Sequence, residues 1–177
     1  MSVDAGLTTF AEFEKFPDPV AGHYELHHGQ VVLMPPRKKV HMQIQQVLFD
    51  LLSPLLGGLG FLTIEFAFRP APEYEAWQCG IGFALQDRWD KDDHEYFLGA
   101  PDLVIEVLSA SNTMDEILER QAICLANGCR AFWTVDPKRR TVMLTNPSGV
   151  TVTYTASSSV PLPDPLPGSI EVAEIFR

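Results

Sequence analysis

Apolar residues recur along this chain at two different spacings, which predict helices and strands in alternation. Over residues 40–56 they return every three or four positions, the period of an amphipathic helix, and a cluster of glycines follows. The same spacing recurs after a run of capping residues and stops at Gly128. The predicted helices are a short one that opens at residues 9–12 and ends at Pro17, and two longer ones over residues 40–56 and 114–127.

Alternating and continuous apolar runs predict the strands. Residues 23–26 and 30–34 flank a turn at His28-Gly29 and indicate a β-hairpin. Residues 103–108 are almost continuously apolar, which is typical of a central strand that is covered on both faces. The other predicted segments are strands over residues 61–68, 81–85, 131–135, 141–145 and 150–155, a solvated acidic loop over residues 87–95, a proline-rich turn over residues 162–168 and a short C-terminal segment over residues 169–176.

Length and composition place the chain among globular proteins with one domain, residues 1–177. Its 177 residues are enough to bury a core, and 46% are hydrophobic and 20% charged, close to the globular average. No apolar run approaches the roughly 18–20 residues that span a bilayer, and the N-terminus has no basic segment followed by an apolar stretch. We therefore expect a cytoplasmic protein that makes no membrane contact.

Charge and cysteine content narrow the function classes further. The net charge of −10 opposes binding to phosphate backbones, although carboxylates around a divalent cation can reverse the local potential. Three cysteines without a C-x-x-C pair argue against a disulfide framework and a structural zinc site. Cys124 lies in an apolar helical stripe and is predicted to be a packed thiol.

Glu106 is the most informative residue of the sequence. A carboxylate inside an apolar central strand costs several kcal/mol unless it is paired, protonated or bound to a metal. Asp102 precedes it by four positions, so alternation places both side chains on one face, roughly 13 Å apart along the strand. That separation is too long for both to chelate one ion directly, and Asp102 could equally anchor the start of the strand. Glu106 needs a partner from another element.

Five other residues are considered as the partner of Glu106 or as neighbours of that pair. Glu25 lies in the predicted hairpin, where an exposed strand glutamate is the simpler interpretation. Arg120 lies two turns into the helix after Glu106 and could point back toward the carboxylates. His41, near the start of the long helix, is predicted to be a capping or surface residue, and the pair His27-His28 is predicted to form a turn rather than a metal site.

Several motifs resemble the Uma2 (DUF820) family, in the same order and over most of the chain. Residues 24–26 (YEL) with Gly29, followed by His41, resemble the opening of that family, and residues 99–109 (GAPDLVIEVLS) are close to its most specific motif. The remaining matching segments are residues 126–128 (ANG), 132–137 (FWTVDP), 166–168 (LPG) and 172–176 (VAEIF).

The resemblance implies an α/β, restriction-endonuclease-like fold with a central mixed β-sheet flanked by helices. In such enzymes an aspartate and a glutamate on neighbouring strands bind Mg²⁺ (or Mn²⁺), and a lysine orients the attacking water. Glu106 matches the strand glutamate and Glu25 an N-terminal acidic position. The metal ligands expected from this resemblance are Glu106 and Glu25, with Asp102, Glu73 or Glu75 in place of the family's aspartate.

Two positions depart from the family pattern. Cys79-Gly80 stands where a Pro-Asp pair is expected, so the metal-binding aspartate is missing. Arg120 stands where the family has its lysine, and arginine keeps the charge but does not release a proton near neutral pH. Arg120 could still hold a phosphate or carboxylate group.

Two functions from different classes follow. The first is an Mg²⁺-dependent endonuclease that hydrolyses DNA phosphodiester bonds with Glu106, Glu25, Asp102 and Arg120. The second is a catalytically inactive family member that serves as a binding or assembly module. The family resemblance and Glu106 favour the first, whereas the acidic surface and the two departures favour the second. A homodimer is expected from the resemblance in either case.

Overall fold

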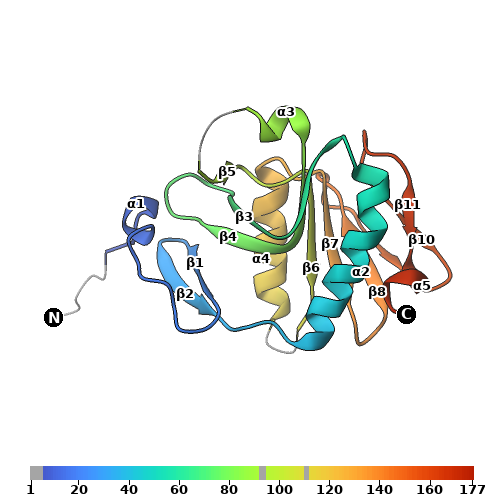
Figure 1. Ribbon diagram of the computed structural model, residues 1–177, viewed down its shortest axis with the longest axis horizontal. Coiled ribbons are helices and arrows are strands. Elements are labelled where there is room, and N and C mark those ends of the chain that lie inside the picture. The colour runs from blue at the N-terminus through green and yellow to red at the C-terminus, as the bar shows by residue number, and fades with distance from the viewer. Residues whose placement is uncertain (1–5, 92–94, 110–111) are drawn as a thin grey trace.

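The computed structural model of this protein describes residues 6–91, 95–109 and 112–177, whose strands form a seven-stranded mixed sheet. Its strand order is β5-β3-β4-β6-β7-β8-β9, with the pairs β3–β5 and β6–β7 parallel and the other neighbours antiparallel (Figure 1). The strands are β3 (Gly60–Arg69), β4 (Trp77–Leu85), β5 (Phe97–Leu98), β6 (Leu103–Val107), β7 (Ala131–Asp136), β8 (Thr141–Thr145) and β9 (Thr151–Tyr154).

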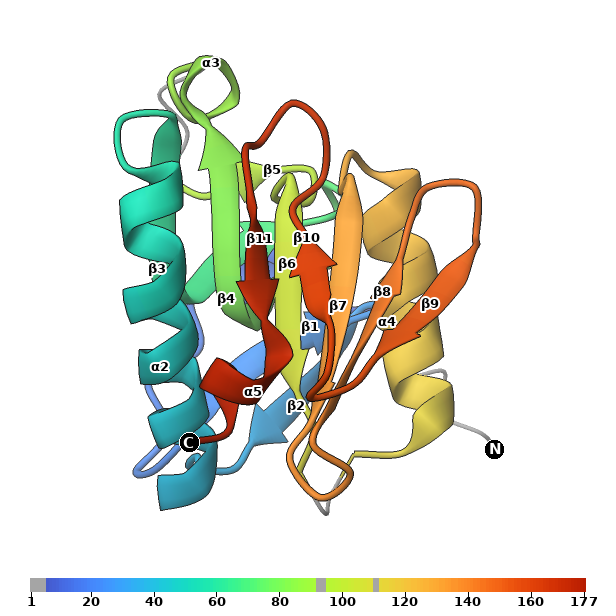
Figure 2. The same ribbon diagram turned by 90° about the vertical axis from the view of Figure 1, so that its right-hand side faces the viewer.

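Helices cover both faces of this sheet. Helix α2 (Lys39–Leu56) shares one core with β10 (Ser159–Pro161), β11 (Ser169–Glu171) and α5 (Val172–Ile175), and Figure 2 shows these elements in front of the central strands. Helix α4 (Met114–Ala126) contributes to a second core on the opposite face. The central strand β6 divides its side chains between the two cores, which explains why its apolar run is continuous.

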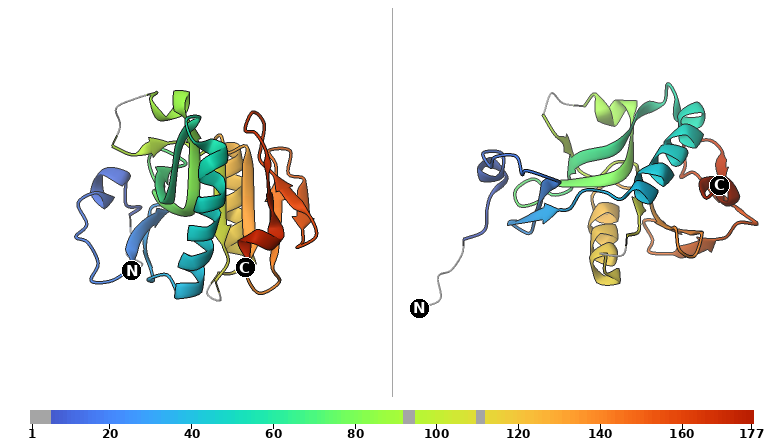
Figure 3. Two further views of the ribbon diagram at one scale, coloured as in Figure 1. Left: turned by 45° about the vertical axis from the view of Figure 1, so that its right-hand side comes forward. Right: turned by 60° about the horizontal axis from the view of Figure 1, so that its bottom comes forward.

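The hairpin of β1 (His23–His27) and β2 (Gln30–Met34) forms a separate two-stranded sheet at one side of the molecule (Figure 3). Its turn uses positive φ angles of 49° at His28 and 73° at Gly29, as a two-residue hairpin loop requires. The short helix α1 (Phe10–Phe13) lies beside it and begins with the capping box predicted at Thr9. An isolated bridge between Leu26 and Ala76 joins the hairpin to the segment before β4, so β1 is held next to the main sheet.

The structure confirms the α/β architecture with a central mixed sheet and corrects several boundaries. Strand β4 begins at Trp77 and not at Ile81, because residues 77–79 pair with β3 in the same register as the rest of the strand. The predicted acidic loop contains the short helix α3 (Gln86–Trp89), and its residues 92–94 lie outside the described part of the chain. The C-terminal segment contains β11 and α5, and β10 was not predicted. Among the described residues, none of the helices has the length and apolar character that crossing a membrane requires.

Candidate functional site

Glu106 lies in β6, between β4 and β7, and only 8% of its surface is exposed. Its Oε2 accepts a hydrogen bond of 3.2 Å from the Gly80 backbone N–H, and its Oε1 lies 3.1 Å from Nη2 of Arg120. The buried carboxylate therefore has both a backbone donor and a cation, which offset the cost of removing its charge from water.

Glu25 from β1 is more deeply buried, at 1% exposed, and is not the exposed strand glutamate of the simpler interpretation. Its Oε2 lies 2.8 Å from Nη1 of Arg120 and 2.7 Å from Nε2 of His27. Its Oε1 accepts a hydrogen bond of 2.9 Å from the Gln78 backbone N–H and lies 3.3 Å from Nε2 of His23. Each oxygen of Glu25 therefore has two partners already.

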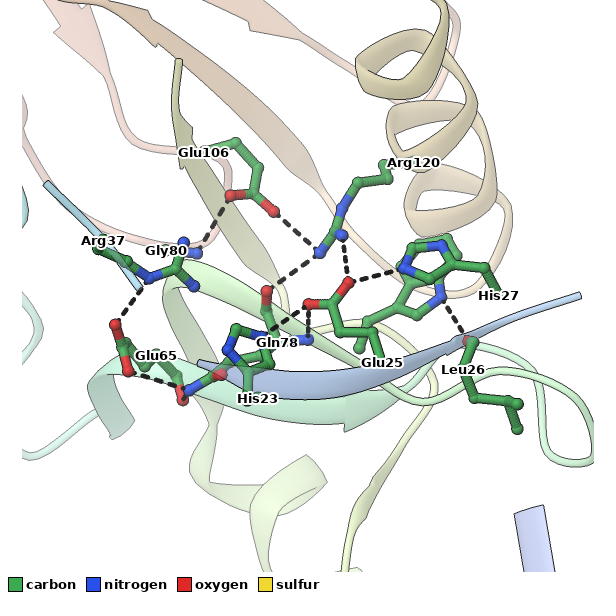
Figure 4. Close-up of polar contacts among 11 residues, drawn as sticks. His23, Glu25, Leu26, His27, Arg37, Glu65, Gln78, Gly80, Glu106 and Arg120 are labelled. Carbon is green, nitrogen blue, oxygen red and sulfur yellow. Dashed lines mark hydrogen bonds and ion pairs between the residues drawn. The ribbon is translucent and has the colours of Figure 1, made fainter. Parts of the chain in front are cut away.

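Arg120 connects the two acids. It points from α4 toward the sheet, as the sequence suggested it could, and Figure 4 shows its guanidinium between Glu106 and Glu25. Nη2 also donates a hydrogen bond of 3.1 Å to the backbone carbonyl of Gln78, and the guanidinium carbon lies 5.0 Å from the ring centre of Trp77. With 11% of its side chain exposed, Arg120 is the cation of a buried three-residue ion network.

The charges of this network shift its pKa values in different directions. Burial raises the pKa of Glu25, but Arg120 and the flanking histidines outweigh it, so the pKa ends well below 4.5. For Glu106 burial dominates and raises the pKa, although Arg120 opposes the shift. Burial would lower the pKa of Arg120, but the two carboxylates raise it above its ordinary value, so the guanidinium stays charged. Glu25 is thus the firmly ionised member, whereas Glu106 is the carboxyl that protonates more easily.

Gly80 faces Glu106 across the β4–β6 pair. The register pairs Ile81 with Ile105, and one further step along both strands brings position 80 opposite position 106. A Cβ at position 80 would lie 3.6 Å from Oε2 of Glu106, so a side chain there would enter this site. The geometry is consistent with position 80 being the place of the family's metal-binding aspartate, where this chain has no side chain.

The network borders a cavity of about 250 Å³ between the β1–β2 hairpin, the N-terminus of α2 and the loop after β6. Glu25, Glu106 and Arg120 line one part of it. The polar and charged residues that line the rest of it include Arg37, Lys38, His41, Ser109 and Asn112.

Asp102 does not join the other predicted acids. It lies at the opposite end of β6 with no exposed surface, where Oδ1 is 2.9 Å from Nε of Arg130 and Oδ2 is 3.1 Å from Nη1 of Arg88. Oδ2 also accepts a hydrogen bond from the Leu85 backbone N–H. The expectation that Asp102 shares a metal site with Glu106 and Glu25 is therefore corrected, since these three carboxylates do not come together. Its contacts match the alternative that Asp102 anchors the start of the strand.

Glu75 and Glu73, the two other acids suggested in place of the family's aspartate, lie elsewhere as well. Glu75 is buried, but it contacts Nδ1 of His28 at 2.8 Å and accepts a hydrogen bond of 2.8 Å from Nε1 of Trp77. Glu73 is exposed. Neither lines the cavity that holds Glu106.

His41 is not the capping or surface residue that the sequence predicted. It lies in the first turn of α2, is 8% exposed, and its Nε2 is buried without a hydrogen-bond partner among the described residues. Burial, followed by the neighbouring charge of Arg37, lowers the pKa of His41 to about 4, so the imidazole is neutral at pH 7. Its position three residues before the buried Ile44 is the signal in the sequence that could have indicated this burial.

The depressed pKa predicts a pH dependence of stability. Between about pH 4 and 6.5 the unfolded chain protonates at position 41 and the folded chain does not, so the free energy of unfolding should fall as the pH falls through this window. We expect NMR titration of the assigned imidazole to give a midpoint near 4, and urea unfolding of His41→Gln to show a weaker pH dependence from pH 4 to 6.5. A midpoint near 6.5 would contradict this burial.

The residues of the network do not suit a divalent ion in the observed arrangement. Mg²⁺ needs several oxygen ligands in near-octahedral geometry. Arg120 binds one oxygen of each carboxylate, and Gly80 supplies no side-chain oxygen. Within the described ranges, no group of three or more His, Cys, Asp or Glu residues is placed to hold a metal ion. The Mg²⁺ (or Mn²⁺) site expected from the resemblance is therefore not formed by these residues.

The buried cysteines take no part in this site. Cys79, Cys124 and Cys129 are all free and buried, as the sequence predicted for Cys124. Burial raises the pKa of the Cys79 and Cys124 thiols well above 9.0, so they stay protonated and unreactive at neutral pH.

Comparisons with known proteins agree with the fold and with the sequence motifs. Residues 10–174 match the model of the Uma2 family, which is described as "Putative restriction endonuclease". The crystal structure of "a putative nuclease belonging to DUF820" from Anabaena variabilis ATCC 29413 superimposes with a TM-score of 0.84 at 21% identity, over 95% of this chain and 97% of that one. A search of curated proteins finds no match. Because the family match covers nearly the whole chain, this protein belongs to the Uma2 (DUF820) family, and it shares the fold of that crystal structure.

Proposed function

We propose that this chain uses the nuclease fold as a binding module and does not itself hydrolyse phosphodiester bonds, the second of the two functions expected from its sequence. One observation carries the proposal: Arg120 lies between Glu25 and Glu106 and forms ion pairs of 2.8 and 3.1 Å with them. The guanidinium supplies the positive charge that a metal ion would otherwise bring to these acids.

The chemistry of hydrolysis explains why this substitution matters. A metal ion activates the attacking water by lowering its pKa and stabilises charge on the phosphodiester. Arginine has no accessible neutral form near pH 7, so Arg120 cannot act as a general base. Gly80 offers no ligand oxygen, and Glu25 is saturated with hydrogen bonds. Hydrolysis would therefore require Arg120 to leave two buried carboxylates.

A second candidate is Mg²⁺-dependent cleavage of DNA. It is favoured by the family's description as restriction endonucleases and by the cavity that holds Glu25, Glu106 and Lys38 together. Lys38 could stand in for the missing lysine, since lysine is a compact charge that changes its pKa readily. DNA would then be the partner, and the same cavity would have to take one of its phosphates.

Metal-dependent cleavage separates the two functions. We expect supercoiled plasmid incubated with the full chain and Mg²⁺ or Mn²⁺ to remain intact, and metal titration heats to be the same for the wild type and Glu106→Gln. The variant replaces one carboxylate oxygen by an NH₂ group of similar size. It therefore removes the negative charge of Glu106 without opening a cavity. Cleavage that needs the metal and disappears in Glu106→Gln would establish the nuclease and reject the binding module.

A homodimer and a cytoplasmic location, both expected from the sequence and the family resemblance, stay predictions. Sedimentation analysis of the purified chain tests the first. The binding module requires neither.

A further inference from the structure

The N-terminus of α2 borders the cavity, and no acidic residue there offsets the positive end of the helix dipole. This 18-residue helix has no acidic residue in its first turn, and no side chain of the described residues caps it by a hydrogen bond. Helix geometry leaves the N–H groups of Lys39, Val40 and His41 without intrahelical acceptors. These N–H groups and the helix dipole favour a negatively charged group at this end.

A second observation at the same place points to a missing partner. Nε2 of His41 is buried and has no hydrogen-bond partner among the described residues, although the side chain lines the cavity. Buried polar atoms are rarely left unpaired, because they lose their hydrogen bonds to water without gaining others. In the neutral imidazole Nε2 can carry the proton, and this buried N–H then needs an acceptor oxygen.

Two lysines, Lys38 and Lys138, lie near this end of α2, and neither forms an ion pair with any of the described residues. Lys38 precedes the helix, lines the cavity and is exposed. A neighbouring cavity of about 360 Å³ shares Lys38, His41 and Ser109 with the first and is also lined by Lys138. The acids nearby have cationic partners: Glu25 and Glu106 share Arg120, Glu65 pairs with Arg37 at 2.7 Å, and Asp136 pairs with Arg139 at 2.9 Å. In a chain with a net charge of −10, this is a local cationic site.

From these features we propose that the N-terminus of α2 binds the phosphate group of a small phosphomonoester, with Lys38, His41 and the first-turn N–H groups as its donors. A tetrahedral oxyanion accepts several converging hydrogen bonds, which matches a helix terminus flanked by lysine. A cavity of about 250 Å³ holds a small molecule and not a duplex. The acidic surface repels a long polyanion but affects a single phosphate far less. This inference rests on the proposed binding role, for which it names the ligand class.

NMR titration of the full chain with inorganic phosphate, and separately with glycerol phosphate, tests the site. We expect saturable shifts of the backbone amides of Lys39, Val40 and His41 and of the His41 imidazole. The N-terminus of α4 is a control within the same molecule, because Thr113 and Glu116 cap it and its amides should not shift. Lys38→Gln should weaken binding about tenfold, as loss of a charge-assisted hydrogen bond does. His41→Gln should also weaken it, whereas the matched control Lys15→Gln should not.

Three outcomes would overturn the inference. They are equal shifts at the α2 and α4 termini, binding unaffected by Lys38→Gln, and shifts caused only by an oligonucleotide and not by either small phosphate. Lys38 is exposed, so its variant tests the site even if His41→Gln fails to fold. Plasmid cleavage tests the proposed function separately, so phosphate binding together with metal-dependent cleavage would reject the binding module and keep this site.

Discussion

Replacing Arg120 by methionine should lower the free energy of unfolding by about 3–5 kcal/mol, the cost of leaving buried charges without their partner. Arg120 is the cation that both Glu25 and Glu106 contact, and both acids are more than nine-tenths buried. Methionine keeps much of the apolar stem of the side chain, so the loss reports mainly on charge. Urea unfolding at pH 7 measures it.

Two controls separate the network from a general effect of removing an arginine. Arg177→Met removes an exposed arginine whose pair with Glu174 is 3.7 Å long, and should change stability by less than about 0.5 kcal/mol. In a chain that already carries Glu25→Gln and Glu106→Gln, Arg120→Met should lower the free energy of unfolding much less. The two amides carry no charge that would be left without a partner. If Arg120→Met and Arg177→Met cost the same, the three residues do not act as a buried ion network.

The sequence predicted those elements whose pattern is local and strong. Residues 40–56 and 114–127 have a clear helical period, and the helices lie within one residue of these bounds. Residues 103–108 were predicted as a central strand, and β6 lies between β4 and β7 with all five of its residues buried. In each case the spacing of apolar residues indicates the type of element.

Elements that depend on distant partners were predicted less well. The first part of β4 contains Gln78 and Gly80, which weaken the strand pattern, and it becomes a strand because β3 pairs with it. Side-chain alternation suggested that Asp102 shares a face with Glu106. It could not show that Arg88 and Arg130, from elsewhere in the chain, fully engage this carboxylate. Long-range ion pairing leaves no periodic signal in a sequence.

The sequence named Glu25, Glu106 and Arg120 as candidates but not their arrangement. A buried acid at position 106 implied a partner from another element, and Arg120 was one of the candidates. The ion pair between Arg120 and Glu25 joins residues 95 positions apart, which only the docking of the hairpin against α4 creates. The role of His41 was missed for a similar reason, because its missing hydrogen-bond partner is visible only in three dimensions.

Restoring a carboxylate at position 80 and a lysine at position 120 should create a divalent-ion site. Gly80→Asp places a side chain beside Oε2 of Glu106, and Arg120→Lys replaces a forked donor by a single ammonium group that releases carboxylate oxygens. We expect the double variant to bind Mn²⁺ with a dissociation constant on the order of 10⁻³ M or tighter, as weak carboxylate sites do for Ca²⁺. Paramagnetic broadening of β4 and β6 amides in NMR spectra measures this binding, and the wild type should show none that depends on Glu106.

Position 80 is tightly packed, so a side chain there requires a small movement of the strand. A Cβ there would lie 2.9 Å from the Ile105 carbonyl oxygen and 3.2 Å from Nε2 of Gln45, so β4 must shift by a few tenths of an ångström. Circular dichroism should therefore confirm that the variant is folded. Gly6→Asp with Arg120→Lys is the matched control, because position 6 has no heavy atom within 4 Å and adds the same charge away from the site. Equal broadening in both variants, or broadening that survives Glu106→Gln, would show that position 80 does not face a latent metal site and that Arg120 does not take the place of a metal ion.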